Sequence, residues 1–76
     1  MRYQVWGDRD TDSEAMLFDT AYLGNAMAWA REYVRFGDFG GYDTITVFEQ
    51  YDNEHDNGRV HLTISSYHWK FINGEL

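Results

Sequence analysis

Alternating carboxylates are the first residues of the chain whose type and spacing could do chemistry. In the stretch GDRDTDSEAMLFD, residues 7–19, they are Asp8, Asp10, Asp12, Glu14 and Asp19. Oxygen ligands on alternate residues are typical of a calcium-binding loop, but that loop needs glycine at its sixth position and a bidentate glutamate at its twelfth. Those positions hold Ser13 and Asp19, so we interpret the stretch as a solvated acidic loop. Weak calcium binding in loop 8–19 is the alternative.

A second acidic group surrounds a histidine in the segment DNEHDNG, residues 52–58. It consists of Asp52, Glu54, His55 and Asp56. An imidazole and two carboxylates could hold a divalent cation, but metal sites normally draw their ligands from fixed elements, and these four share one hairpin tip. We therefore expect a polar turn, and we assign no metal ion and no cofactor to the chain.

The other residues with catalytic potential do not form a catalytic pattern. We expect His61 on the outward face of a strand and His68 in an aromatic tail, and neither position brings a nucleophile and an orienting acid together. The glycine-rich segment 37–43 lacks the Lys-Ser/Thr pair of a phosphate-binding loop. A chain of this size also rarely builds the cleft that raises the pKa of one carboxyl. We expect a protein that is not an enzyme.

The net charge of the chain limits the classes of molecule that it can bind. There are 13 Asp and Glu residues against 6 Lys and Arg, which gives a formal net charge of -7. A negative field repels nucleic acid and anionic membranes and attracts basic partners. Cysteine is absent, which excludes disulfides, and no apolar run is long enough to cross a bilayer. We therefore expect a soluble, cytoplasmic protein without direct nucleic-acid or membrane binding.

The elements that position these residues follow from the hydrophobic pattern. Residues 2–6 and 15–18 predict two strands on either side of the first acidic loop, and residues 44–51 and 59–65 predict a second hairpin. In the last strand we expect Val60, Leu62 and Ile64 to point inward. A helix lies between the hairpins. This β-β-α-β-β order predicts an α+β fold, a single domain over residues 1–76 with one helix packed on a largely antiparallel sheet. The same order places the two acidic loops at opposite ends.

The helix is expected to start after an N-cap at Asp19 or Thr20 and to end near Phe36, before Gly37. It presents two adjacent apolar stripes. The first, which we expect on the sheet, contains Leu23, Met27, Ala30 and Val34; the second contains Tyr22, Ala26, Trp29, Tyr33 and Phe36. We expect the C-terminal tail to cover the second stripe, with residues 67–72 extending the last strand. A dimer or partner surface is the alternative cover.

The acidic charge and the surplus of aromatic rings favour a non-enzymatic protein-binding module. Carboxylates two residues apart on an extended chain are about 6.6–6.8 Å apart, on the scale of a phosphate backbone. We therefore expect an inhibitor that occupies a basic nucleic-acid-binding surface of its target, a nucleic-acid mimic of the kind that phages and other mobile elements encode. The residues expected to steer the partner are Asp8, Asp10, Asp12, Asp52, Glu54 and Asp56, and those expected to anchor it are Trp29, Tyr33 and Trp69. The alternative is a self-associating structural module, a homodimer through the aromatic helix stripe and the tail.

Overall fold

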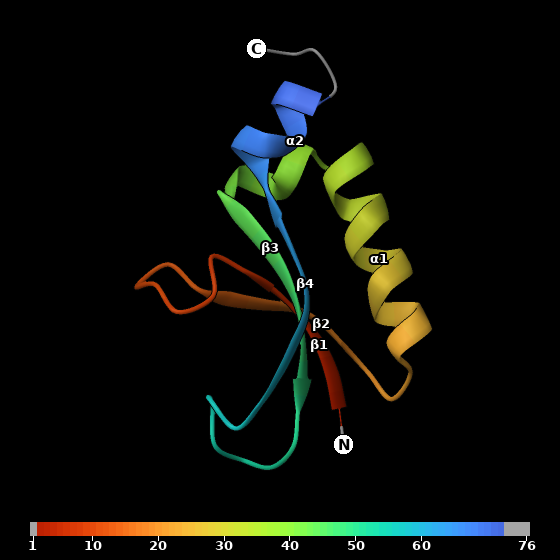
Figure 1. Ribbon diagram of the computed structural model, residues 1–76, viewed down its shortest axis with the longest axis vertical. Coiled ribbons are helices and arrows are strands. Elements are labelled where there is room, and N and C mark those ends of the chain that lie inside the picture. Colours follow the sequence, from red (N-terminus) through yellow and green to blue (C-terminus); the bar gives the residue numbers. More distant parts are fainter. Residues whose placement is uncertain (1, 73–76) are drawn as a thin grey trace.

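The computed structural model describes the backbone of residues 2–72 and the side chains of residues 2–69. The elements are β1 (Arg2–Gly7), β2 (Ala15–Thr20), α1 (Leu23–Phe36), the short 3-10 helix η1 (Asp38–Gly41), β3 (Thr44–Gln50), β4 (Gly58–Ser65) and α2 (Ser66–Ile72). The four strands form one antiparallel sheet in the order β2-β1-β3-β4, and α1 lies against one face of it (Figure 1). The predicted α+β class and the β-β-α-β-β order are confirmed. Over residues 2–72, no helix combines the length and the apolar character that a membrane span requires.

The core lies between α1 and the sheet. Ala26, Ala30 and Val34 recur every four residues on the buried side of α1, and the two alanines allow the helix to approach the sheet closely. They pack against the inward side chains of the two central strands, among them Val5 and Val47, which are paired across β1 and β3. The helix ends as predicted at Gly37, whose amide donates a hydrogen bond to the carbonyl of Tyr33.

The start of α1 differs from the prediction. Strand β2 continues to Thr20, with Asp19 paired to Gln4 in the ladder, so neither residue is free to cap a helix. The N-cap is Tyr22, which is extended and makes no side-chain capping bond. The Thr20 hydroxyl instead accepts a hydrogen bond from the Tyr22 amide at 3.3 Å, which supports the turn before the helix.

The C-terminal tail is helical, so the prediction that residues 67–72 extend the last strand was wrong. The reason lies in the partner strand. Ser65 pairs with Thr44, the first residue of β3, so a longer β4 would have no neighbouring strand to pair with. The chain turns into α2, and the Ser66 amide donates to the carbonyl of Asp43 at 2.8 Å.

A bulge in β4 reverses the predicted orientation of two side chains. Leu62 pairs with Val47 and Val60 pairs with Phe48, which leaves His61 as an extra residue between them. Leu62 and Ile64 pack against the core as predicted, but Val60 is on the opposite face and 53% exposed. His61, expected outward, turns toward α1.

On that inner side His61 is partly buried against two neighbours. Its Nε2 lies 2.7 Å from Glu49 Oε1. Its ring stands edge-on to the ring of Tyr3, with ring centres 6.0 Å apart. The bulge thus gives the carboxylate of Glu49, which is buried in the sheet, a hydrogen-bonding partner.

Candidate functional site

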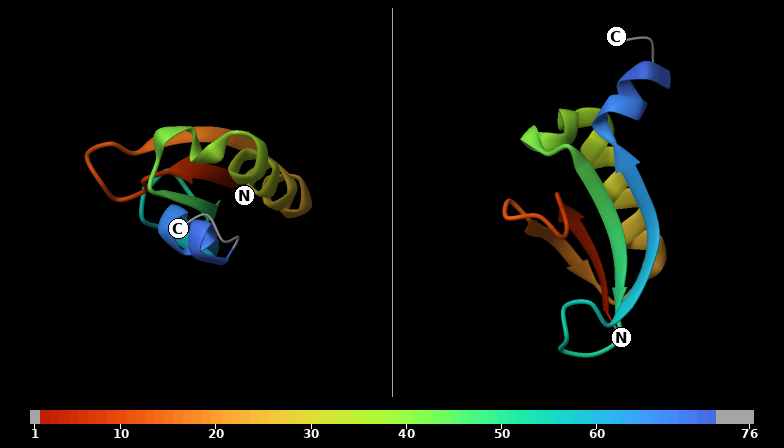
Figure 2. Two further views of the ribbon diagram at one scale, coloured as in Figure 1. Left: turned by 90° about the horizontal axis from the view of Figure 1, so that it is seen from above. Right: turned by 60° about the vertical axis from the view of Figure 1, so that its left-hand side comes forward.

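The two acidic loops meet on the face of the sheet away from α1. They leave the sheet at opposite ends of β1, because Gly7 pairs with Ile45 whereas Arg2 pairs with Gln50. The prediction of opposite ends therefore holds for the strand ends. It was wrong for the loops themselves, because six extended residues span only about 20 Å and both loops project on the same side of the sheet (Figure 2, right), where His55 reaches Glu14.

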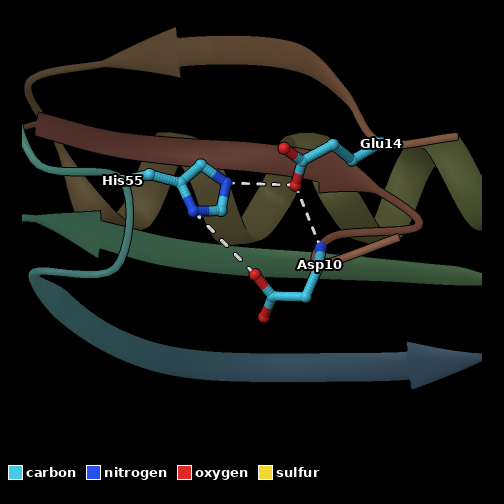
Figure 3. Close-up of side chains that lie close together, drawn as sticks. All are labelled: Asp10, Glu14 and His55. Carbon is cyan, nitrogen blue, oxygen red and sulfur yellow. Dashed lines mark hydrogen bonds and ion pairs between the residues drawn. The ribbon is translucent and has the colours of Figure 1, made fainter. Parts of the chain in front are cut away.

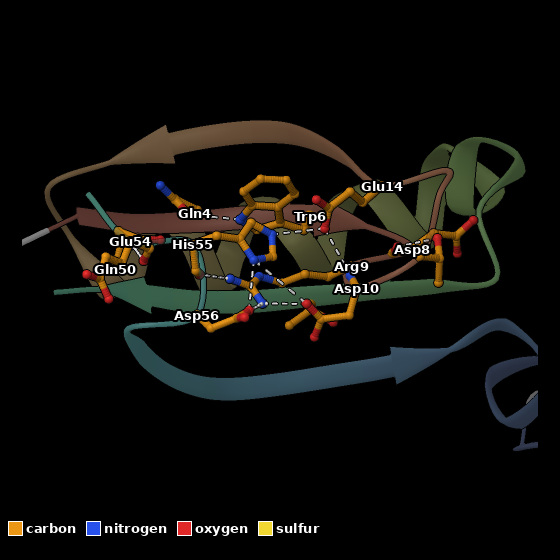
Figure 4. Close-up of polar contacts among 12 residues, drawn as sticks. Gln4, Trp6, Asp8, Arg9, Asp10, Glu14, Gln50, Glu54, His55 and Asp56 are labelled. Atoms are coloured by element: carbon orange, nitrogen blue, oxygen red, sulfur yellow. Dashed lines mark hydrogen bonds and ion pairs between the residues drawn. The ribbon is translucent and has the colours of Figure 1, made fainter. Parts of the chain in front are cut away.

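Arg9 joins the loops on the side nearer the sheet. Its guanidinium carbon lies 3.7 Å from the ring centre of Phe48 and 5.3 Å from that of Trp6, two rings that the strands present on this face. Only 5% of the side chain is exposed. One terminal nitrogen donates to the backbone carbonyl of His55, and the other lies 3.3 Å from the carboxylate of Asp10 (Figure 4). A cation buried against aromatic rings and paired with a carboxylate is a strong positional constraint.

His55 also joins the two loops, through their carboxylates. Its Nε2 lies 3.0 Å from Glu14 Oε1, and its Nδ1 lies 2.8 Å from Asp56 Oδ1 and 3.9 Å from Asp10 Oδ1 (Figures 3 and 4). The imidazole stands edge-on to the indole of Trp6, with ring centres 5.5 Å apart. Hydrogen bonds to Asp56 and then to Glu14 raise the pKa of His55 above its ordinary value of 6.5.

Loop 8–14 holds Glu14 in place for this contact. Asp8 and Asp10 adopt left-handed backbone angles, with φ of 49° and 69°, which aspartate tolerates better than most residues. The loop closes on itself because the Asp10 amide donates to Glu14 Oε1 at 3.0 Å. That bond, and after it the hydrogen bond with His55, lowers the pKa of Glu14 below its ordinary value of 4.5.

The predicted steering acids fall into two groups. Asp8 and Asp52 are engaged within the fold: Asp8 Oδ1 accepts from the amides of Asp43 and Thr44 at 2.8 and 3.1 Å, and Asp52 accepts from the Glu54 amide and the Asn57 side chain. The others face solvent. Within residues 2–69, the carboxylates of Asp12 and Glu54 form no hydrogen bond or ion pair, and Asp10 and Asp56 are 66% and 85% exposed.

We call the joined carboxylates of the two loops the acidic face. Its members are Asp10, Asp12, Glu14, Asp52, Glu54 and Asp56. Two basic side chains, Arg9 and His55, lie among these carboxylates and join the loops, and the guanidinium of Arg9 is shielded from solvent. The outward surface is therefore negative, and hydrogen bonds within and between the loops hold the carboxylates of Asp10, Glu14, Asp52 and Asp56.

The predicted anchors are on the other side of the sheet. Trp29 stacks between Phe18 of β2 and Tyr33, with ring centres 5.1 and 4.9 Å apart. Phe18 thus covers the Trp29 ring of the stripe that we expected the tail to cover, whereas Tyr22 and Phe36 of that stripe are 69% and 79% exposed. Trp69 packs against the core and, with Val34, lines a groove of about 470 Å³ beside α1. An anchoring contact by these three rings would belong to a different surface from the acidic face.

A groove of about 520 Å³ adjoins the acidic face instead. Trp6, Met16 and Tyr51 give it an apolar lining, and Gln4 and Asp52 are among its polar neighbours. Met16 and Tyr51 are each about half exposed, at 49% and 50%. The face thus combines negative charge with accessible apolar surface.

A cation site is less consistent with this geometry. Asp10, Glu14 and His55 bring ligand atoms within 4.8 Å of one another, but these atoms already pair with the imidazole or with Arg9. The five carboxylates of loop 8–19 do not converge either: Asp8 binds two amides, and Asp19 pairs with Arg2 at 2.8 Å in the sheet. Positive charge is supplied by the chain itself at this place.

The residues that assemble the acidic face were not predicted from the sequence. Arg9, Trp6 and Phe48 carry no motif, and their contact depends on which face of the sheet each residue occupies. Two signals were present: a single arginine within an acidic run, and aromatic residues at strand positions opposite the core.

Comparison with family models, with curated proteins and with solved structures finds no match to this chain.

Proposed function

We propose that the chain is a non-enzymatic binding module whose acidic face docks on a basic, nucleic-acid-binding surface of another protein. In this proposal it acts in the cytoplasm as an inhibitor of the kind that phages and other mobile elements encode. The partner would lose access to nucleic acid because carboxylates occupy the sites of phosphates.

One observation carries the proposal. Two acidic loops are held against each other on one face of the sheet by Arg9 and His55, through contacts that join residues 46 and 41 positions apart in the chain. Like charges repel, so bringing these carboxylates together opposes folding unless cations or a partner compensate. A preorganised set of charges also binds with a smaller loss of conformational freedom than two mobile loops would.

The groove lined by Trp6, Met16 and Tyr51 supports the same proposal. Electrostatic attraction raises the rate of encounter, whereas slow dissociation depends on apolar side chains buried at the centre of the contact. An accessible groove next to the carboxylates gives the partner a place for one apolar residue or the stem of a lysine or arginine.

The experiment is affinity capture from host lysate with three forms of the chain. The first is the wild type. The second, Asp12→Asn with Glu54→Gln and Asp56→Asn, removes three charges from the acidic face. The third, Glu32→Gln with Asp38→Asn and Asp43→Asn, removes three charges from exposed residues outside that face.

We expect wild type and control to retain the same basic protein, and the acidic-face variant to lose it. Duplex DNA added to the lysate should displace that protein, because DNA and the acidic face compete for one surface. Retention of the same proteins by all three forms, or retention that DNA does not alter, contradicts the proposal.

A further inference from the structure

Among the residues whose side chains the structure describes, His55 is the one that contacts both acidic loops and ordinarily titrates near neutral pH. It belongs to the loop between β3 and β4, and its Nε2 reaches Glu14 of the loop between β1 and β2. The loops are otherwise joined by the bond from Arg9 to the His55 carbonyl and by the long ion pair of 4.0 Å between Arg9 and Asp56.

Both ring nitrogens of His55 face carboxylates. A neutral imidazole carries one N–H and one lone pair, so it can donate to Glu14 or to Asp56 but not to both. The second nitrogen would then direct its lone pair at a carboxylate oxygen. An imidazolium donates from both nitrogens and attracts both carboxylates, so the observed geometry is complete only when the ring is protonated.

We infer that His55 is a proton-controlled latch, which holds the two acidic loops together as the imidazolium and weakens the contact between the loops when it loses its proton, because the neutral ring can donate to only one of Glu14 and Asp56. The groups that face the ring are consistent with this. Glu14, Asp10 and Asp56 favour the imidazolium, and Arg9 is the opposing charge. Trp6 packs on the ring edge from β1 and carries no charge.

The latch is limited at low pH as well as at high pH. Glu14 must be ionised to accept from the imidazolium, and its pKa is lowered mainly by the Asp10 amide. The latch is therefore closed between the pKa of Glu14 and that of His55. Because the pKa of His55 is raised, closure extends above pH 6.5 and ends as the pH rises through the shifted value.

Closure also reaches the backbone. Glu14 Oε1 accepts from the Asp10 amide and from the imidazole at the same time, so loss of one partner changes the other. The amide proton of Asp10 is thus a reporter of the latch that lies in the loop opposite His55.

The regulatory consequence rests on the proposed function. When the latch is closed, the imidazolium attracts carboxylates of both loops, and when it opens, Arg9 is the remaining cation that joins the loops. Binding to the basic partner should then weaken above the midpoint of the His55 titration, beyond the effect of pH on the partner itself.

The test is a pH titration of the free chain by NMR, without any partner. The ring signals of His55 and the amide signal of Asp10 are followed in the wild type, in Glu14→Gln with Asp56→Asn, and in Asp19→Asn. The last variant removes a carboxylate that pairs with Arg2 at the sheet edge and serves as the control.

In the wild type and the control we expect His55 to titrate above pH 6.5 and the Asp10 amide to move with the same midpoint. In the double variant the midpoint should fall toward 6.5, and the coupled movement of the Asp10 amide should disappear. A wild-type His55 midpoint at or below 6.5, or an Asp10 amide that does not follow it, overturns the latch. The wild-type titration decides this even if a variant does not fold.

Failure of the latch is distinguishable from failure of the proposed function. A partner that binds equally tightly on both sides of the His55 midpoint, together with the expected NMR result, leaves the latch in place and removes only its regulatory consequence. Loss of the latch in the free chain, together with capture of the partner, removes the latch alone.

Discussion

The guanidinium of Arg9 lies over the ring of Phe48, 3.7 Å from its centre, and is almost hidden from solvent beneath two acidic loops. Replacement by alanine would remove the cation–π contacts, the bond to the His55 carbonyl and the packing of the long side chain. We predict that Arg9→Ala lowers the free energy of unfolding by about 2–3 kcal/mol. Denaturation by urea measures this. Arg59→Ala, at an exposed arginine in β4, should change it by less than about 0.5 kcal/mol.

Asp8 should contribute to stability more than to binding. Its carboxylate accepts two backbone amides at the start of β3, and its φ of 49° disfavours alanine. We predict that Asp8→Ala costs about 1–3 kcal/mol of stability. Asp8→Asn retains an acceptor oxygen and tolerates the same backbone angle, so it should cost distinctly less. Equal losses in the two variants, measured by thermal or urea unfolding, would show that the hydrogen bonds do not matter.

Two glycines give a matched pair of predictions. A Cβ on Gly7 would lie 2.5 Å from the ring of Tyr42, whereas a Cβ on Gly24, on the exposed side of α1, would meet nothing within 4 Å. Gly7→Ala should therefore destabilise by about 1–3 kcal/mol. Gly24→Ala should leave stability unchanged or raise it by up to about 1 kcal/mol. Calorimetry of both variants tests whether the Tyr42 ring packs against the backbone at Gly7.

The pH dependence of stability should reveal His55. A raised pKa in the folded state contributes stability that is fully present below pH 6.5 and is lost as the pH rises through the folded value. The lowered pKa of Glu14 contributes stability that is present above pH 4.5 and is lost as the pH falls through its own folded value. The difference in unfolding free energy between wild type and His55→Gln should therefore be largest between pH 4.5 and 6.5. A difference in unfolding free energy that grows toward pH 9 would contradict a raised pKa of His55.

Calcium and zinc should not stabilise the chain. Arg9 and His55 already supply positive charge to the carboxylates that a cation would use, and Asp8 and Asp19 are engaged elsewhere. We predict that millimolar calcium or equimolar zinc leaves the Tm of the metal-free chain unchanged. A rise in Tm on adding metal that is absent in His55→Gln would indicate a metal site in place of the proposed latch.

Much of the fold was predictable because local patterns determined it. Alternation over residues 2–6 and 44–51 reflects strands with one face on the core, and Gly37 ends the helix as its position suggested. The bulge at His61 was not predictable, since an extra residue is defined only by the partner strand. The tail was misread for a similar reason: its alternating rings fit a strand, but β3 begins at Thr44 and offers nothing to pair with.

The candidate site was predictable only in part. The sequence identified both acidic loops and most of their solvent-facing carboxylates. It could not show that the loops meet, because that contact depends on how each loop bends over the sheet and on Arg9 lying over Phe48 and beside Trp6. For the same reason the aromatic anchors were sought on α1, whereas the accessible rings next to the acids, Trp6 and Tyr51, are in and after the strands.

The most direct test of the account is the Kd of the captured, purified partner for wild type, for the acidic-face variant and for the control variant, each at low and high salt. We predict that the acidic-face variant binds at least about 10-fold more weakly, about 1.4 kcal/mol, and with a smaller salt dependence than wild type. The control should stay within about twofold of wild type, because scattered exposed charges contribute little to a specific contact. Equal weakening of both variants would mean that net charge alone attracts the partner, and the acidic face would lose its assigned function.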